Sequence, residues 1–403
     1  MDFRRDELQT ELCDLARRLL EARVTADFLR IHTASGAPFD ALLWEQLHEA
    51  GLVTASVPAE AGGLGFGMLE LGWILEAAGR VLAPVPLLST AIGARALAAA
   101  AHARSDGETT RWLTAVMQQR AILALALMDA SDDPLVPAVS ARTLKRDDGA
   151  VEPGRQADDD WLLSGCKTAV AFGVEASALL VTATTPEGPA LFLVPGNATG
   201  LVRHPQCSTH GEPWALVSFD DLRLPAAARL GGQDAVTRLV LETRAAHAAF
   251  QVGVAEAALR QTADYVTTRH QFGRPLGSMQ AVQQRVADAY IDVEAMRSTS
   301  LLAAGLLDAD EKGEVAGDGN PHATLAADVA VAAYWAAQAG HRVTHATQHL
   351  HGGMGADVEY PIHRYFLRAK ATGLGLGGAQ SLLARIGTEI VAGRIRRLSG
   401  VET

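Results

Sequence analysis

Two short segments combine residue types that could bind a ligand. RHQFGRP runs from Arg269 to Pro275, and HLHGGMG runs from His349 to Gly355. The guanidinium of an arginine offers several donors in one plane, which suits a phosphate, and glycines let a ligand approach the backbone closely. Each segment alone also fits a plain helix end, because glycine favours a C-cap and proline cannot continue a helix. Neither segment by itself predicts a site.

A metal site is the competing interpretation of the second segment. Histidines at positions 341, 345 and 349 recur every four residues and would share one face of a helix. No cysteine lies near them, and no HExxH pattern supplies a base. The cysteines Cys13, Cys166 and Cys207 are far apart, unlike a disulfide framework or a zinc site. We therefore expect no metal, and a protein of a reducing, cytoplasmic compartment.

Composition excludes two kinds of partner. The chain has 403 residues and a formal net charge of -11 at pH 7, whereas nucleic-acid binding needs a basic surface. Any stretch of about 18 residues contains charge or proline, so we expect no membrane span. The N-terminal segment carries acids and arginines throughout and has no apolar core of a signal peptide.

Apolar spacing divides the chain into three blocks. Helical periodicity extends from residue 4 to about 117, and short apolar runs typical of strands follow from about 121. Helical periodicity returns after a glycine pair at 231–232, with long helices predicted over 234–269, 278–308 and 321–351 and a connection over 311–321. We predict an α+β chain with a helical domain over 1–120, a β domain over 121–231 and a helical bundle over 232–403.

Together the two segments resemble one known family. RHQFGRPLGSMQAVQQRVAD and HGGMGADVEYPIHRYFLRAK, separated by one helix, loop and helix, are similar to the C-terminal domain of acyl-CoA dehydrogenases. LSGCK (163–167), FDDLRLP (219–225) and the glycine-rich loop at 58–67 extend the resemblance along the chain. It implies a helical N-terminal domain, a β-barrel-like middle domain and a four-helix bundle, with FAD as cofactor. The implied reaction is α,β-dehydrogenation of an acyl-CoA thioester, in which a carboxylate removes the α-proton and a hydride leaves to the flavin.

The resemblance also implies which residues contact the cofactor. A subunit of this family lends the arginine and phenylalanine of RxxFG, and a later glutamine, to FAD across a dimer interface. The Q-x-x-GG segment of the family brings its backbone to the same cofactor. We therefore expect a cofactor-contacting surface in this chain at Arg269, Gln271, Phe272, Gln280, His349, Gly352 and Gly353.

The catalytic carboxylate of the family does not appear where the resemblance places it. Its usual position, counted from RAK at 368–370, falls near Leu376, and no acid lies between Glu359 and Glu389. A minority of members carry the base on the first long bundle helix, just before an arginine. Here Thr243 occupies that position, and Glu242 is its neighbour, about 100° away around a helix. Glu242 is the candidate base, although a structural glutamate is the common alternative.

The family's contacts to a subunit's own flavin are also altered. MDASDDP (128–134) stands where the family has T-E-P-x-x-G-S, and Ala169–Ala171 stands where it has W-I-T. The residues that a subunit contributes to its neighbour's FAD are retained, whereas the residues that contact its own flavin are degraded. This pattern resembles members that form mixed tetramers, among them enzymes that degrade sterol side chains.

Three hypotheses follow from these departures. The chain is an FAD-dependent acyl-CoA dehydrogenase subunit with Glu242 as base, for which a homo-oligomer suffices. Alternatively, it is a non-catalytic partner that completes the FAD site of another acyl-CoA dehydrogenase-like subunit in a hetero-oligomer. The third is a flavin-free module that binds acyl-CoA or protein. An electron-transfer flavoprotein is a possible partner of the first two.

Overall fold

The computed structural model describes residues 3–104, 107–131, 133–144, 160–314 and 321–393. Contacts group the chain into two compact units, one of Met1–Ser56, Phe66–Val85 and Leu241–Thr403, the other of Val57–Gly65 and Pro86–Val240. The predicted α+β architecture of helices, sheet and helices is confirmed. The predicted domain boundaries at 120 and 231 remain a prediction, because the contacts group two N-terminal helices with the sheet. Most of the predicted connection over 311–321 lies outside the described residues.

The first unit begins with four amphipathic helices, α1 (Glu7–Arg23), α2 (Ala26–Ser35), α3 (Ala41–Glu49) and α4 (Met68–Val81). Asp6 starts α1 with a capping box, in which its side chain accepts from the backbone N–H of Gln9 and the Gln9 side chain accepts in return. Asp40 precedes α3 as its N-cap residue, and its carboxylate pairs with Arg23 of α1. The capping box of Asp6 therefore fixes where α1 begins, and the Asp40–Arg23 pair joins α1 to the start of α3.

The same unit contains α7 (Gln233–Thr268) from Leu241 onward and the long helices α8 (Gln280–Glu311) and α9 (Pro321–Leu350), followed by α10 (Ile362–Leu374) and α11 (Gly378–Val391). The three long helices start and end within a few residues of their predicted limits. Their shared core consists of small and branched side chains, namely Val252, Ala255, Leu259, Ala289, Val293, Met296, Ala339 and Val343. Small residues let the backbones approach closely: a Cβ on Gly253 would collide with the carbonyl of Glu76 in α4.

An ion network ties α4 to this bundle. Glu76 and Arg80 of α4, Glu256 of α7 and Arg297 of α8 bond one another, with 2.8 Å between the Arg80 and Glu256 groups. The two guanidinium groups hold the pKa of Glu256 below its ordinary value, against the opposing effect of burial. Because each charge has an opposite neighbour, the attraction between these groups offsets the desolvation cost of their burial, and the network orients α4 against α7 and α8.

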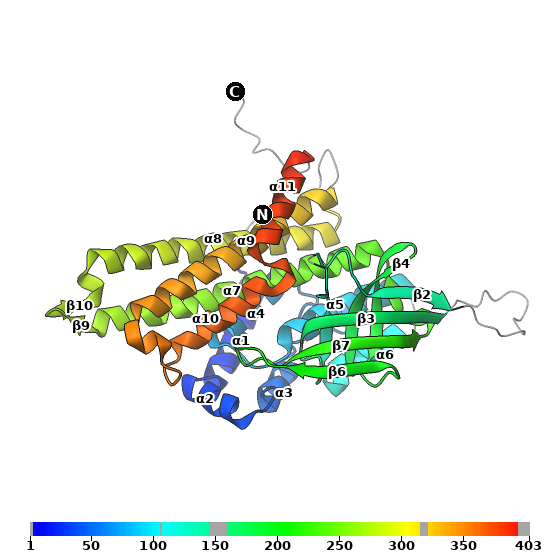
Figure 1. Ribbon diagram of the computed structural model, residues 1–403, viewed down its shortest axis with the longest axis horizontal. Coiled ribbons are helices and arrows are strands. Elements are labelled where there is room, and N and C mark those ends of the chain that lie inside the picture. Colours follow the sequence, from blue (N-terminus) through cyan, green and yellow to red (C-terminus); the bar gives the residue numbers. More distant parts are fainter. Residues whose placement is uncertain (1–2, 105–106, 132, 145–159, 315–320, 394–403) are drawn as a thin grey trace, which may run out of the picture. The chain divides into compact units, whose positions relative to one another are not determined.

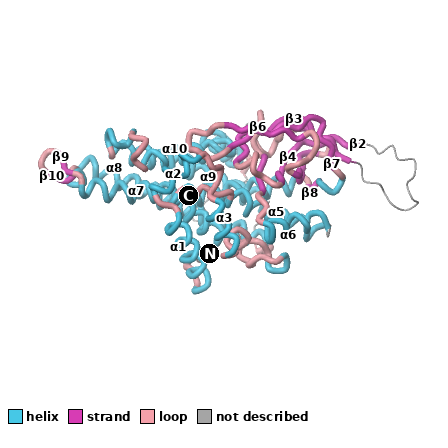
Figure 2. The backbone as a smooth tube through the Cα atoms, turned by 90° about the horizontal axis from the view of Figure 1, so that it is seen from below, coloured by secondary structure: helices cyan, strands magenta, loops and turns pink. Residues whose placement is uncertain are grey.

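In the second unit, the described residues form an eight-stranded mixed sheet (Figures 1 and 2). Its strands are β1 (Leu123–Ala126), β2 (Ser140–Leu144), β3 (Asp160–Ala171), β4 (Ala178–Thr185), β5 (Gly188–Pro195), β6 (Leu201–Gln206), β7 (Trp214–Leu224) and β8 (Arg229–Gly231). They lie in the order β6-β7-β3-β2-β4-β5-β8, and β1 pairs in parallel with β4. Helix α5 (Leu87–Arg104) packs on β1, and α6 (Gly107–Gln119) packs on α5. The strands predicted from apolar runs beyond about residue 121 are therefore observed as one mixed sheet.

Candidate functional site

The RHQFGRP segment forms a hairpin rather than a simple helix end. Helix α7 ends at Thr268, and the short antiparallel strands β9 (His270–Gln271) and β10 (Arg274–Pro275) follow. Both turn residues have positive φ, 54° for Phe272 and 75° for Gly273. Such φ values fit the mirror-image turns that favour two-residue hairpins, but they are unfavourable for phenylalanine.

Phe272 is 90% exposed at the tip of this hairpin. Figures 1 and 2 show β9 and β10 projecting beyond the ends of α7 and α8. A solvated aromatic ring in an unfavourable backbone conformation stabilises nothing within its own chain. A ring of this kind is typical of a residue that packs against something else. Arg269, Gln271 and Gln280, the first residue of α8, are also exposed at this end of the bundle.

The HLHGGMG segment ends α9 and passes into a 3₁₀ turn, Gly352–Ala356. Gly352 has a φ of 60°, and a Cβ on Gly352 or Gly353 would meet no atom within 4 Å. Gly355 differs, because a Cβ there would collide with the carbonyl of Gln348. Gly355 is therefore needed for packing, whereas the backbone of Gly352 and Gly353 is open to a ligand.

Side-chain contacts join the two segments. His351 is 2% exposed, and its ring stacks on Tyr265 of α7 with 4.3 Å between centroids. Its Nε2 lies 3.2 Å from the hydroxyl of Thr262, also on α7. Burial lowers the pKa of His351, so the ring is neutral. Since Arg269 follows Tyr265 by one helical turn and Gly352 follows His351 directly, the structure brings the two segments to one end of the bundle.

The residue types at this end suit a dinucleotide. Arg269, Gln271 and Gln280 supply a guanidinium and two amides, Phe272 supplies an aromatic face, and the glycine pair supplies accessible backbone. The predicted contact His349 is exposed, and its Nδ1 lies 2.6 Å from a guanidinium nitrogen of Arg285 on α8. Arg285 was not among the residues that the sequence predicts. FAD fits these donors, and the individual contacts remain predictions.

The candidate base Glu242 is buried, with 4% of its surface exposed, as are its neighbours Thr243 and Arg244 on α7. Two residues along a helix correspond to a rotation of about 200°, so Glu242 and Arg244 point to opposite sides of α7. Glu242 is therefore not a solvated surface residue. Its role as a base stays a prediction.

A pocket lies on the Arg244 side of α7. Its walls come from α7, α9, α10, the following 3₁₀ turn and α11, at Arg244, His247, Ala248, Ala333, Ala336, Ala337, Thr372, Gly373, Gly375 and Leu382. The pocket thus lies between two elements that carry a base in members of the family. One is α7, where a minority of members have the base, and the other is the segment with Gly373 and Gly375, next to the usual base position near Leu376. Its lining, among the described residues, contains no aspartate or glutamate. His247, which no sequence motif pointed to, has its Nδ1 2.9 Å from the Thr243 carbonyl, and this contact orients the ring.

In the sheet unit, Asp129 of the altered 128–134 segment forms an ion pair with Lys167. Lys167 of the LSGCK motif is fully buried, and its Nζ lies 2.6 Å from Asp129, 3.0 Å from the Thr182 hydroxyl and 3.3 Å from the Leu127 carbonyl. Asp129 also accepts from the N–H groups of Ser131 and Ala138. Burial alone would raise the pKa of Asp129, but these donors hold it below its ordinary value. The Asp129 carboxylate is thus held by groups of its own chain, among them Lys167 of β3.

The W-I-T position is also irregular. The pairing of β3 with β7 shifts between Lys167 and Val170, and Ala169 has a φ of 52°. The amide of Ala169 donates to the side chain of Gln206 on β6, at 2.9 Å. This part of β3 offers alanine methyl groups where the family resemblance expects an aromatic ring and a hydroxyl.

Two further observations concern the predicted absences. Within the described residues, histidine, cysteine, aspartate and glutamate do not gather in threes at a spacing that could hold a metal ion. None of the helices in the described part of the chain is both long and apolar enough to span a membrane.

Two family models match the chain. One is described as acyl-CoA dehydrogenase, N-terminal domain, and covers residues 6–119. The other is described as acyl-CoA dehydrogenase, C-terminal domain, and covers residues 231–391. The chain is 36% identical to acyl-CoA dehydrogenase FadE27 of Mycobacterium tuberculosis over 392 residues, which cover 97% of this chain and 99% of that protein.

Two solved structures are similar over nearly the whole chain. One is the ChsE4–ChsE5 complex from Mycobacterium tuberculosis, with a TM-score of 0.83, 36% identity, and coverage of 97% of this chain and 99% of the matched one. The other is a variant of the Tcur3481–Tcur3483 steroid ACAD, with a TM-score of 0.83, 38% identity, and coverage of 96% and 98%.

Proposed function

We propose that this chain works as one subunit of a mixed tetramer. The chain belongs to the acyl-CoA dehydrogenase family, whose members are oxidoreductases that act on CH–CH bonds of acyl-CoA. In this assembly it completes the FAD site of a second, catalytic acyl-CoA dehydrogenase-like subunit. The observation that carries the proposal is the exposed hairpin with Phe272 at its tip, at the same end of the bundle as the open backbone of Gly352 and Gly353.

The chain's own pocket supports the same proposal. The pocket that contains Arg244 and His247 is lined, within the described residues, without a carboxylate. A general base contributes roughly 10²- to 10⁴-fold to a reaction of this kind. A subunit without one would contribute little turnover, yet it could still hold the cofactor of its partner.

In this dehydrogenation, the residues of this chain would bind and shield the cofactor. FAD supplies the hydride acceptor when it is bound. Arg269 would neutralise phosphate oxygens of the dinucleotide, and Gln280 would donate an amide hydrogen bond to it. Phe272 would cover part of the cofactor and exclude water, which strengthens the polar contacts around it. The α-proton would be taken by a carboxylate of the other subunit.

The similarity to a steroid ACAD and to a two-protein complex suggests the substrate and the assembly. We propose an acyl-CoA thioester of a sterol-derived acid as substrate, in the cytoplasm, with an electron-transfer flavoprotein as the acceptor.

A second candidate function retains Glu242 as the base in a homo-oligomer. The observation that favours it is the burial of this carboxylate on α7, one position from the rarer base site. A shift of α7 by one residue, equivalent to a rotation of about 100°, would bring Glu242 to the side of Thr243.

Purification of the chain alone and with a co-expressed acyl-CoA dehydrogenase-like partner tests these alternatives. The proposal expects a colourless chain alone and a yellow complex, with activity toward a sterol-derived acyl-CoA only in the complex. A yellow, active chain alone would establish the homo-oligomer instead. A complex that forms without flavin would favour the flavin-free module.

Two variants of the complex sharpen the test. Glu242→Gln should leave turnover unchanged if the partner supplies the base, and a loss of roughly 10²-fold or more would assign the base to this chain. Arg269→Met should weaken FAD binding by roughly 10-fold or more, because it removes a charge-assisted contact. Full FAD affinity in Arg269→Met would contradict a cofactor role for the hairpin.

A further inference from the structure

Arg285 of α8 and His349 of α9 bond each other across the two helices. The distance between an Arg285 guanidinium nitrogen and His349 Nδ1 is 2.6 Å, and both side chains are exposed. An arginine side chain in a protein is always a donor and never an acceptor. For this contact to be a hydrogen bond, Nδ1 must be the acceptor, which assigns the ring proton to Nε2.

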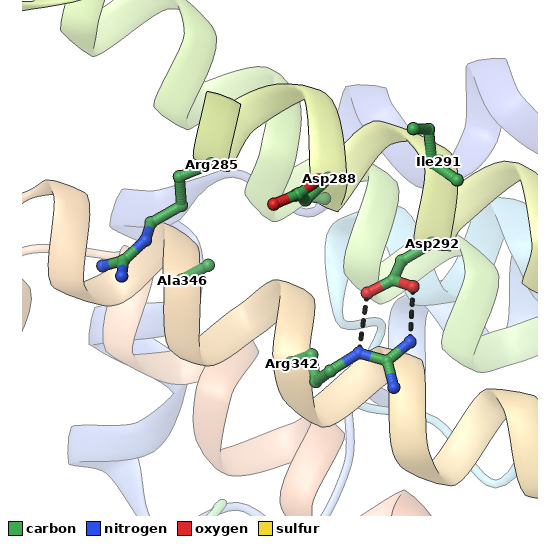
Figure 3. Close-up of a pocket in the computed structure, with 7 residues that line it drawn as sticks. Arg285, Asp288, Ile291, Asp292, Arg342 and Ala346 are labelled. Carbon is green, nitrogen blue, oxygen red and sulfur yellow. Dashed lines mark hydrogen bonds and ion pairs between the residues drawn. The ribbon is translucent and has the colours of Figure 1, made fainter. Parts of the chain in front are cut away.

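The neighbouring Asp292 is paired with Arg342, which leaves the Arg285 guanidinium available to bond His349. Seven residues further along α8, Asp292 accepts two hydrogen bonds from Arg342, which precedes His349 by seven residues on α9. Figure 3 shows this ion pair, with Arg285 reaching along the pocket toward α9 and past Ala346. Asp288 also lines the pocket. The Asp292–Arg342 pair holds the two antiparallel helices in the register that brings Arg285 to His349.

The consequence is that the Arg285–His349 pair itself can only donate, although the carboxylate of Asp288 also lines the pocket. The remaining guanidinium N–H groups of Arg285 and the Nε2–H of His349 belong to exposed side chains, and His349 lies three residues before the open backbone of Gly352. A histidine with a free choice of tautomer could present either a donor or an acceptor there. Pairing with Arg285 removes that choice.

We propose that Arg285 is a cofactor-positioning residue. It fixes His349 as the Nε2–H tautomer, and the pair donates to a phosphate or ribose oxygen of the dinucleotide bound beside Gly352 and Gly353. This inference rests on the proposed function, because it assigns a role within the cofactor surface that the chain lends to its partner. The competing role is structural: a guanidinium near the C-terminal end of α9 would stabilise that helix through its dipole.

The tautomer is tested on the chain alone, without flavin. Nitrogen NMR of protein labelled with ¹⁵N-histidine, with His349→Gln to assign the signal, should show His349 protonated on Nε2. Arg285→Met should convert this signal to a mixture of tautomers. A wild-type His349 protonated on Nδ1 would overturn the proposal.

The cofactor role is tested by titrating the apo-complex with FAD. Arg285→Met should raise the Kd for FAD roughly 10-fold, the effect of losing a charge-assisted hydrogen bond. Arg285→Lys, which can still donate to Nδ1, should recover most of the affinity. The urea midpoint of the chain alone should not change in either variant. An unchanged Kd together with a lower midpoint would establish the structural role and overturn the proposal.

Two controls separate this inference from the proposed function. If Arg269→Met weakens FAD binding and Arg285→Met does not, the proposed function stands and the role of Arg285 is refuted. If the complex binds no FAD at all, both are refuted. ADP and adenosine as competitors identify the acceptor: an Arg285→Met effect on ADP alone indicates a phosphate oxygen, and an effect on both indicates the ribose.

Discussion

Tyr265 stacks on His351 with 4.3 Å between ring centroids and 23° between ring planes. This contact joins the last turns of α7 to the turn that follows α9, so it sets the position of the hairpin segment relative to the glycine pair. Tyr265 also reaches Met354 of the same turn with its hydroxyl. This aromatic pair is therefore one of the contacts that set the geometry of the candidate site, together with the bond between His351 and Thr262.

The stack predicts measurable coupling between its two residues. Tyr265→Leu and His351→Leu should each lower the free energy of unfolding, and the double variant should lose about 1 kcal/mol less than the sum. Urea unfolding of the four proteins measures this coupling. Effects that add to within a few tenths of a kcal/mol would mean that the stack contributes nothing of its own.

The same histidine predicts a pH dependence. Burial lowers the pKa of His351 in the folded chain below its ordinary value of about 6.5, so the unfolded chain binds a proton there more readily. Stability from this residue is thus present above pH ~6.5 and is lost as the pH falls toward the folded pKa. His351→Leu should have a shallower dependence of the urea midpoint on pH between about 7.5 and 5. His32 and His341, whose pKa values are also lowered by burial, retain part of the slope in the variant.

The elements of the fold could be predicted because their determinants are local. The first bundle helix was expected over 234–269 and is observed at Gln233–Thr268, since apolar periodicity and the glycine and proline after it define its limits. The β9–β10 hairpin was not expected. A pair of two-residue strands leaves no periodic pattern, and the positive φ of Phe272 contradicts the preference of its residue type.

Contacts between distant residues could not be predicted from the sequence. Lys167 was recognised as part of a motif, but its partner Asp129 lies 38 residues away, and Arg285 and His349 are 64 residues apart. Such pairs depend on strand order and helix register, which periodicity does not specify. The candidate base Glu242 is a further example. Counting residues along α7 predicts the direction of its side chain around the helix, but its burial depends on the packing of other elements and could not be predicted.

The Lys167–Asp129 pair predicts a large loss of stability in the sheet unit. Lys167→Met should cost about 3–5 kcal/mol, because it leaves the Asp129 carboxylate in a buried loop without its counter-ion. Thr182→Val is the matched control, since it removes one neutral partner of the same ammonium and should cost about 1 kcal/mol. Urea unfolding combined with hydrogen exchange in β3 and β4 measures both. Equal effects of the two variants would contradict an ion pair as the main interaction.

The start of α4 depends on a carboxylate that is 240 residues away in the sequence. The two oxygens of Asp308 on α8 accept from the backbone N–H groups of Met68, at 2.6 Å, and Leu69, at 3.0 Å. Gly67, the N-cap residue, has no side chain to cap the helix, and a Cβ there would collide with Asp308. Asp308 therefore supplies both the cap and a negative charge at the positive end of α4.

This arrangement predicts that two distant substitutions damage the same interaction. Asp308→Ala should cost about 1–2 kcal/mol, and Asp308→Asn less, because an amide still offers one acceptor. Gly67→Ala should also destabilise the chain, by displacing the Asp308 carboxylate. The double variant Gly67→Ala, Asp308→Ala should be little worse than the poorer single variant, since the contact can be lost only once. Urea unfolding decides the point: losses that simply add would place the two residues in independent interactions.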